Sequence, residues 1–276
     1  MRIDAHQHFW LFDPVKDAWI TDEMKEIQRN FLPNDISLTM KEQQFDGVIA
    51  VQADQSLREN DFLLELAQAY ALIKGIVGWV DLQSKDVENQ LAHYAKFPKM
   101  KGFRHIVEAE DDPDFMMRDN FLQGIEALSK YGFTYDLLIK PKHYSSTLNC
   151  VKSNPQQAFM LDHIAKPPIK SQAFDEWTSF ISELSEHPHV FCKLSGLATE
   201  ADWKHWELDH FNVYIEHVIR CFGIDRMLFG SDWPVCLLAG SYTDSLNIVE
   251  GHLKNFTEEE RKGFWGLNAV AFYGLK

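Results

Sequence analysis

Eight short runs of apolar and β-branched residues recur along the chain, and amphipathic stretches lie between most neighbouring runs. Most of the runs are continuously apolar rather than alternating, which is typical of parallel strands buried on both faces. They cover residues 3–8, 47–53, 75–82, 102–106, 132–138, 158–165, 190–197 and 227–231. Eight strand–helix units of about thirty residues predict an α/β fold, a closed (β/α)8 TIM barrel, with an open doubly wound sheet as the alternative.

The amphipathic stretches predict helices on the outside of this barrel. They cover residues 35–44, 58–72, 87–97, 115–130, 143–154, 174–186 and 206–222. Thr257 and Glu260 form a capping box ahead of an apolar periodic stretch, so a last helix is predicted over residues 257–272. No linker or repeat divides the chain, and we expect residues 1–276 to form a single domain.

One connection does not follow this alternation. Residues 9–33 show no clear periodicity and contain Trp10, Trp19 and Phe31. Aromatic residues argue against disorder, and a long loop after the first strand of a barrel lies at the end where active sites are built. We therefore expect an active-site loop insertion that forms a wall of the pocket, with a packing flap under the barrel helices as the alternative.

The net charge of −14 restricts the partners of this protein. An acidic surface repels phosphate backbones, so nucleic acid is not an expected partner. No apolar run is long enough to cross a bilayer and the first residues show no signal-peptide pattern, so neither a membrane nor secretion is expected. The four cysteines are widely spaced and form no CxxC pair, which is typical of reduced thiols in a cytoplasmic protein.

Four polar residues lie near the ends of predicted strands. His6 and His8 end the first strand, and alternation along a strand points both side chains the same way. His163 lies in the sixth run, and Asp232 closes the eighth. The C-terminal ends of barrel strands surround one mouth, so these side chains should converge there. Nitrogen and oxygen ligands of this kind suit one divalent metal ion, such as zinc, with an open position for water.

Several sequence blocks, together with these four residues, resemble the amidohydrolase superfamily and, within it, the L-fuconolactonase and L-rhamnono-lactonase branch. The blocks are IDAHQHFW (3–10), VQA (51–53), GWVDL (78–82), GFRH (102–105), LDHIAKP (161–167), CKLSGL (192–197) and FGSDWPVC (229–236). The resemblance implies a (β/α)8 barrel that hydrolyses a sugar-acid lactone. It also implies that His6, His8, His163 and Asp232 form the polar centre.

The chain departs from that family's pattern at two strands. Binuclear members carry a modified lysine at the end of the fourth strand, where this chain has Arg104 and His105. Many members place a histidine on the fifth strand, where this chain has Thr134, Tyr135 and Asp136. The resemblance therefore implies one divalent metal, weakly bound or dispensable, rather than two.

Opening a lactone requires an activated water, stabilisation of the developing oxyanion and a proton for the departing ring oxygen. We expect Asp232 to act as general base, with His163 and His105 as further catalytic residues. The expected metal ligands are His6, His8, His163 and Asp232. Adjacent residues of a strand face opposite ways, so only one of Arg104 and His105 should fully enter the mouth.

The expected substrate-binding residues offer hydrogen bonds or flat apolar surfaces to a sugar. They are Arg104, Trp233, Gln52, Trp19 and Lys193. Each has a plainer alternative: the arginine could form a salt bridge to the helix layer, the tryptophans could simply be packed, and the lysine could extend outward to solvent.

The expected substrate is a small sugar lactone such as L-fucono- or L-rhamnono-lactone, with a role in carbohydrate metabolism. Two other functions stay open. A metal-dependent decarboxylase of an aromatic or unsaturated carboxylic acid would use the same barrel with a firmly held metal and a basic pocket. A non-catalytic sugar-acid binding protein would retain the site without turnover. Eight Trp and twenty Phe residues also provide aromatic surface for a homodimer interface.

Overall fold

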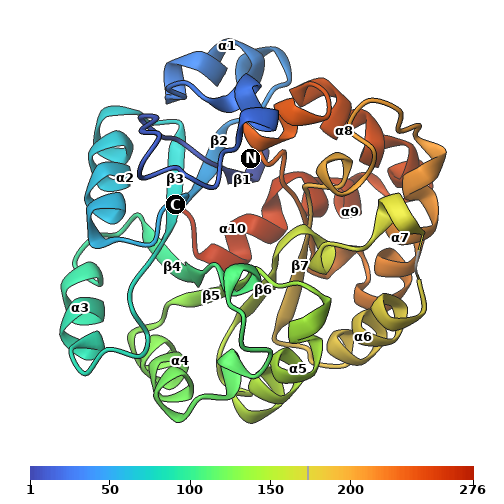
Figure 1. Ribbon diagram of the computed structural model, residues 1–276. Helices are drawn as coiled ribbons and strands as arrows, with labels where there is room; N and C mark the ends of the chain where they lie inside the picture. Colours follow the sequence, from blue (N-terminus) through green and yellow to red (C-terminus); the bar gives the residue numbers. More distant parts are fainter. Residues whose placement is uncertain (173) are drawn as a thin grey trace.

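Eight parallel strands form the centre of the molecule in the computed structural model, which describes residues 1–172 and 174–276. The strands follow one another around the sheet in chain order (Figure 1). They are β1 (Ile3–Gln7), β2 (Gly47–Val51), β3 (Ile73–Gly78), β4 (Met100–His105), β5 (Thr134–Leu137), β6 (Phe159–Leu161), β7 (Val190–Leu194) and β8 (Met227–Phe229). This arrangement confirms the predicted (β/α)8 barrel and excludes the open doubly wound sheet.

The barrel closes where the end of β1 meets the residues that follow β8. Gln7 and Trp233 form a parallel bridge. The amide of Asp232 donates to the carbonyl of His6 at 2.9 Å, and the amide of His8 donates to the carbonyl of Trp233 at 2.7 Å. The same backbone pairing that closes the sheet therefore brings Asp232 beside the two histidines of β1.

The buried carboxylate of Asp4 holds this seam from inside the structure. It accepts hydrogen bonds from the amide of Ser231 at 2.9 Å, from the side chain of Gln7 at 2.7 Å and from the hydroxyl of Tyr242 at 3.1 Å. Because a buried carboxylate needs such donors, Asp4 ties β1 to the segment that carries Asp232.

Helices surround the strands on the outside, as Figure 1 shows. They are α1 (Pro33–Glu42), α2 (Leu57–Ala69), α3 (Val87–Tyr94), α4 (Asp119–Tyr131), α5 (Tyr144–Ser153), α6 (Asp175–Ser185), α7 (Asp209–Phe222), α8 (Tyr242–Glu250) and α9 (Glu258–Lys262), whereas α10 (Asn268–Tyr273) lies across the centre of the view in Figure 1. Seven of them, α1 to α7, lie within or close to the predicted amphipathic stretches. The helix α8 was not predicted, although Ser241 and Asp244 form a capping box at its start.

The predicted last helix is interrupted. Thr257 and Glu260 do form the capping box that opens α9, but a π-helical segment, Gly263–Leu267, separates α9 from α10. Gly266 lies in this segment, where a Cβ atom would come within 2.3 Å of the carbonyl oxygen of Met1. The interruption thus allows the C-terminal segment to pack directly on the backbone at the start of β1.

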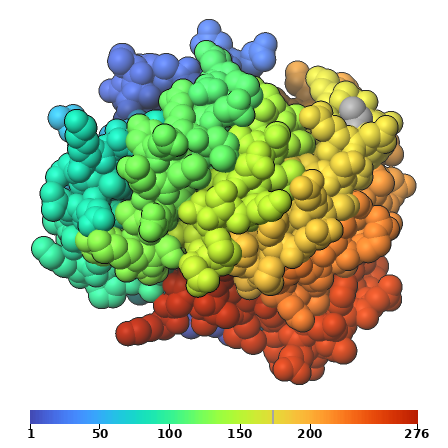
Figure 2. All heavy atoms as spheres, turned by 90° about the horizontal axis from the view of Figure 1, so that it is seen from below, coloured from blue at the N-terminus to red at the C-terminus, as the bar shows by residue number. Residues whose placement is uncertain are grey.

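A small apolar core inside the barrel includes the C-terminal residues. Ala269, Tyr273 and Leu275 pack there with strand residues such as Ile3 and Ile49. Figure 2 shows the C-terminal residues gathered along the lower edge of the molecule, while most of the blue N-terminal residues in view lie along the upper edge. The segment α10 therefore closes the end of the barrel at which the strands begin.

The long loop after β1 packs by its aromatic residues. Trp10 and Phe31 are buried and pair through their backbones, with both amides donating at 2.9 Å. Trp19 contacts Trp10 edge-on at 5.9 Å between ring centroids but keeps 41% of its surface exposed. The loop is thus anchored in the core, and Trp19 extends from it toward the end of the barrel where the strands finish.

Among the described residues, no helix is long and apolar enough to cross a membrane. All four cysteines are free, and Cys150, Cys192 and Cys236 are buried.

The turn from β2 into α2 depends on a buried acidic side chain. Glu59 is 4% exposed, and its carboxylate accepts from the amide of Ala53 at 3.0 Å. Burial raises the pKa of Glu59 to about 7, even though this hydrogen bond lowers it. The folded state therefore retains a proton that the unfolded chain releases, and the free energy of unfolding falls as the pH rises from about 4.5 to 7.

We predict that Glu59→Gln raises the free energy of unfolding by about 2 kcal/mol at pH 8 and changes it little at pH 4.5, because glutamine resembles the protonated acid. Urea denaturation of both proteins at the two pH values measures the effect. An equal difference at both pH values would contradict the raised pKa.

Candidate active site

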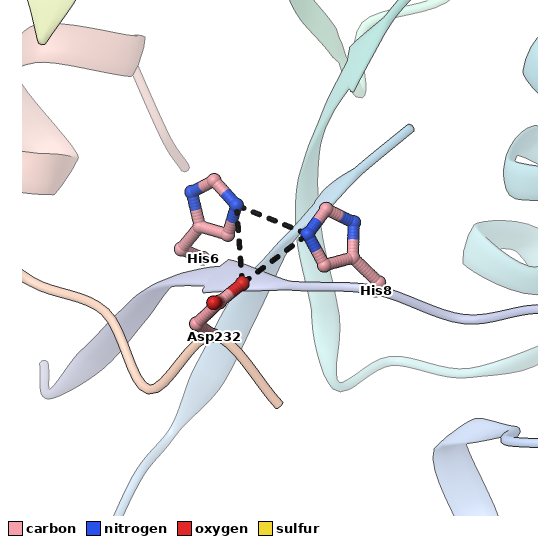
Figure 3. A group of neighbouring side chains, drawn as sticks. All are labelled: His6, His8 and Asp232. Carbon is pink, nitrogen blue, oxygen red and sulfur yellow. Dashed lines mark hydrogen bonds and ion pairs between the residues drawn. The ribbon is translucent and has the colours of Figure 1, made fainter. Parts of the chain in front are cut away.

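His6, His8 and Asp232 meet at the end of the barrel where the strands finish (Figure 3). The two Nε2 atoms of the histidines lie 3.1 Å apart. One carboxylate oxygen of Asp232 lies 3.4 Å from Nε2 of His8 and 3.8 Å from Nε2 of His6. The strand alternation expected from the sequence thus points both imidazoles to the same side.

The outer nitrogen of each imidazole has its own partner. Nδ1 of His8 lies 2.8 Å from the carbonyl oxygen of Val51. That oxygen can only accept, so Nδ1 of His8 carries a proton and donates to it, and Nε2 faces the cluster. Nδ1 of His6 lies 3.4 Å from a carboxylate oxygen of Asp162. Burial lowers the pKa of His6 well below its ordinary value, so this ring is neutral.

These observations fit a divalent metal ion. Two imidazole nitrogens and a carboxylate oxygen point to one place, and the outer nitrogen of His8 is held by a carbonyl acceptor, as in known histidine–metal sites. Ligand atoms around a tetrahedral zinc ion are separated by about 3.4 Å, close to the spacing of these three side chains. The cluster of His6, His8 and Asp232 is therefore the candidate metal site.

A second group consists of His6, Asp162 and His163. Here Asp162 already has two cationic partners, since Nη1 of Arg104 and Nζ of Lys193 each lie 3.0 Å from one of its oxygens. Burial alone would raise the pKa of Asp162, but Lys193, His6 and Arg104 hold it well below its ordinary value. The protein's own cations neutralise this group, which argues against a second metal.

Lys193 lies below the site rather than in it. It is fully buried, pairs with Asp136, and its Nζ lies 3.3 Å from Nδ1 of His6. Tyr273 of α10 donates to the same aspartate at 2.8 Å, and burial raises the pKa of Asp136 to about 6 although Lys193 lowers it. The structure therefore corrects both expectations for Lys193, because it neither lines the pocket nor extends to solvent.

His163 is held by an unusual backbone. Four consecutive residues, from His163 to Lys166, have positive φ values between 45° and 63°. Left-handed backbone costs about 1 kcal/mol or more per residue for side chains with a Cβ atom, and such strain is concentrated at functional sites. The result is that β6 ends at Leu161, earlier than predicted, and the histidine turns into the pocket.

The ring of His163 packs against β7 and the turn after it. Its Nδ1 lies 2.9 Å from the hydroxyl of Ser195. A Cβ atom on Gly196, whose φ is +62°, would lie 2.6 Å from that Nδ1 and 3.2 Å from a carboxylate oxygen of Asp232. Burial lowers the pKa of His163 to about 4, so the ring is neutral near pH 7.

Asp232 is a buried carboxylate that stays ionised. Burial alone would raise its pKa, but His163, the hydrogen bond to His8 and the charge interaction with His6 together hold the pKa well below its ordinary value. Its own φ of +59° turns the side chain back toward the mouth of the barrel.

These residues border a pocket of about 270 Å³. The volume lies near the lower end for ligand sites, roughly 300–1,000 Å³, and suits a single sugar ring. The pocket is lined by His8, Trp19, Ala53, Gln55, Arg104, Ile106, Glu108, Ala109, Leu138, His163, Lys166, Asp232 and Val235. Of the expected substrate-binding residues, Arg104 and Trp19 line this pocket.

Three other expected site residues lie elsewhere. His105 faces the helix layer, where its Nε2 lies 2.7 Å from a carboxylate oxygen of Glu110 and its ring stacks on Phe115. Arg104 faces the mouth instead, since neighbouring strand residues alternate. Gln52 is fully buried and donates to the carbonyl of Arg104, and Trp233 packs in the core. Contrary to the expectation from the sequence, His105, Gln52 and Trp233 therefore do not line the pocket.

Sequence reasoning missed the charged residues that surround the cluster, namely Asp162, Lys166 and Glu108. Asp162 and Lys166 belong to the block of residues 161–167 that already drew attention through His163, and that block was the available signal. No pattern in the sequence singled out Glu108.

The fold and the pocket are those of a barrel hydrolase, and the cluster of His6, His8 and Asp232 could hold a divalent metal ion. The family model described as Amidohydrolase matches residues 3–275, and the chain belongs to this family.

Among its relatives is an L-fucono-1,5-lactonase of Burkholderia multivorans, which is 35% identical over an alignment that covers 100% of this chain and 96% of the relative. A crystal structure of an amidohydrolase from Burkholderia multivorans with bound zinc has a TM-score of 0.96 at 35% identity, with 100% of both chains covered. An L-rhamnono-gamma-lactonase of Scheffersomyces stipitis is 26% identical over 52% of this chain and 48% of its own length.

We predict that His8→Gln weakens the binding of Zn²⁺ by at least about tenfold, because it removes one of three converging ligands. Isothermal titration of the apo protein with Zn²⁺ measures the affinity. His105→Gln is the matched control and should bind as the wild type does, since its ring faces the helix layer. Equal weakening in both variants would argue against the assigned ligand cluster.

We also predict that Gly196→Ala lowers the free energy of unfolding more than Gly132→Ala does. Both glycines have positive φ, but a Cβ atom on Gly132 meets nothing within 4 Å. Gly132→Ala should cost about 1 kcal/mol, and Gly196→Ala about 1–3 kcal/mol more, from overlap with His163. Urea denaturation gives both values; equal losses would show that the ring moves aside freely.

Proposed function

We propose that this protein is a lactonase that opens a sugar-acid lactone, such as L-fucono- or L-rhamnono-lactone, by attack of water on the lactone carbonyl. The observation that carries the proposal is the buried, ionised carboxylate of Asp232 facing a pocket of one-sugar size. The 35% identity to an L-fucono-1,5-lactonase over the whole chain supports the choice of substrate class.

Asp232 acts as the general base. Its low pKa keeps it ionised throughout the neutral range, so it is always ready to accept a proton from water. A low pKa also makes Asp232 a weak base. A weak base is sufficient, because a lactone is an ester and is attacked by water more easily than an amide is. The proton then passes from Asp232 to the ring oxygen as the ring opens.

Arg104 supplies hydrogen-bond donors for the carbonyl oxygen. Its Nη1 is held by Asp162 at 3.0 Å and its Nη2 by the carbonyl of Gln52. These contacts fix the guanidinium plane; Nη1 also lies 3.4 Å from Nε2 of His6, and Nη2 has a second hydrogen for another acceptor. Fixed donors of this kind stabilise negative charge that develops on oxygen. Neutral His163, held by Ser195, lies at the same wall of the pocket.

His6, His8 and Asp232 would hold the metal, which we propose to be zinc. A bound divalent cation in this position supplies Lewis-acid polarisation of the carbonyl. Burial keeps His6 in its neutral, metal-binding form, and the carbonyl of Val51 orients the ring of His8.

The charge of the pocket distinguishes this function from the two alternatives. Its lining contains two cationic residues, Arg104 and Lys166, and two anionic residues, Glu108 and Asp232. Apart from the charge of a bound metal ion, this balance among the side chains suits a neutral lactone, whereas a decarboxylase would need further basic side chains for its acidic substrate. A protein that only binds sugar acids would also need excess positive charge, because its ligand is an anion. We also propose a cytoplasmic location, which the four free cysteines support. A homodimer stays a prediction.

We predict that Asp232→Asn lowers lactone hydrolysis by roughly 10²- to 10⁴-fold, the usual contribution of a general base. The assay follows proton release with a pH indicator on the L-fucono, L-rhamnono, D-galactono and L-galactono lactones, with and without a chelator. Asp225→Asn, an exposed aspartate in the 3-10 turn that precedes β8, is the control and should keep wild-type rates. If every lactone stays at its spontaneous rate with the wild-type protein, the proposed function is wrong.

A further inference from the structure

Three charged side chains gather at one wall of the pocket, and the mechanism above does not use them. Lys166 follows β6, Glu108 follows β4, and Glu200 lies in the 3-10 turn after β7. Nζ of Lys166 lies 2.7 Å from a carboxylate oxygen of Glu108 and 3.7 Å from one of Glu200. All three keep between 17% and 26% of their side-chain surface exposed, so the cluster is recessed but reachable.

The position of Lys166 is set by the same left-handed turn that directs His163. Lys166 ends that turn with φ +48°, and both residues line the pocket. Glu108 lines it too. A ligand held by Lys166 and Glu108 would therefore lie directly beside the reacting centre at His163 and Asp232.

The cluster is ionised and carries no spare positive charge. Burial alone would lower the pKa of Lys166, but Glu108 and Glu200 together raise it. Burial alone would raise the pKa of Glu108, but Lys166 brings it below its ordinary value. Burial raises the pKa of Glu200 although Lys166 lowers it, and Lys140 lies near enough to lower the pKa of both Glu108 and Glu200. Two cationic and two acidic side chains therefore leave no excess positive charge to attract a carboxylate or phosphate on a ligand. Neutral hydroxyl groups need no such charge.

An ammonium–carboxylate pair also has the hydrogen-bonding capacity for hydroxyl groups. Lys166 has three N–H donors, and its two carboxylate partners leave one for a ligand oxygen. The carboxylate of Glu108 has about four acceptor positions, of which only part is used by Lys166. A donor beside an acceptor at 2.7 Å matches two neighbouring hydroxyls, one accepting and one donating.

We propose that Lys166 and Glu108 form the subsite that binds neighbouring hydroxyl groups of the lactone ring and thereby selects hydroxylated over unsubstituted lactones. The proposal rests on the proposed lactonase function. Glu200 acts as a positioning residue, because its carboxylate lies 3.7 Å from the ammonium of Lys166 and attracts it.

The experiment compares a sugar lactone with unsubstituted δ-valerolactone, which presents the same ester without hydroxyls. We expect Lys166→Met and Glu108→Gln to lower kcat/KM for the sugar lactone roughly ten- to hundredfold, mainly through KM, as loss of a charged hydrogen bond does. For δ-valerolactone both variants should stay close to the wild type. Lys170→Met, which replaces an exposed lysine of the same loop, is the control and should leave kcat/KM for both substrates unchanged.

The outcomes separate the two proposals. If the wild-type protein hydrolyses neither lactone, the proposed function fails. Suppose instead that the wild type hydrolyses the sugar lactone. If Lys166→Met then lowers kcat/KM equally for both substrates, or for neither, the proposal of a hydroxyl subsite is wrong. If δ-valerolactone is too slow to measure, a rise in KM for the sugar lactone with little change in kcat supports the subsite, and a fall in kcat alone overturns it. Glu108→Gln keeps the side-chain shape and gives the same comparison if Lys166→Met does not fold.

Discussion

The closure of the barrel between β1 and the residues after β8 is the contact on which the site depends. Two backbone hydrogen bonds across this seam, Asp232 to His6 and Trp233 to His8, place the carboxylate beside both imidazoles. The buried carboxylate of Asp4 reinforces the seam through Ser231. Because the same hydrogen bonds close the sheet and assemble the cluster, the fold cannot form without bringing these ligands together.

Below the cluster, the barrel interior is charged, and its charges compensate one another. Arg104 and Lys193 share Asp162, and Lys193 also pairs with Asp136. Buried ions are costly unless they are paired, so removing any one of them would leave an uncompensated charge in the barrel. Asp162 and Lys193 of this network contact Nδ1 of His6 and so orient its ring. Arg104 and Lys193 also occupy the carboxylate of Asp162, which would otherwise be available to a second metal ion. The pocket above it is consequently balanced in charge, which favours a neutral substrate.

Backbone strain is concentrated at the wall of the pocket that follows β6. The left-handed turn from His163 to Lys166 costs several kcal/mol by the usual increments, and the surrounding structure must offset it. It is held by the hydrogen bond from Trp177 to the carbonyl of Ile164 and by that from Tyr144 to the carbonyl of Ala165. The strain places a neutral imidazole and an ammonium side by side in one pocket, which a regular strand or helix could not do.

The sequence by itself determined the barrel and the four central residues, because strand periodicity and strand-end positions are local properties of the chain. His6 and His8 had to share a face, and Asp232 had to follow the eighth strand. Only the tertiary structure decided which neighbours surround them. Lys193 looked like a surface or substrate contact, yet it compensates two carboxylates that come from other strands. His105 and Arg104 are adjacent in sequence, but the register of β4 alone sends one to the helices and the other to the mouth. Glu108 meets Lys166 across 58 positions of sequence, and no local pattern encodes a distance of that kind. Ion pairing and strain depend on the summed packing of many elements, whereas periodicity depends on a few neighbouring residues.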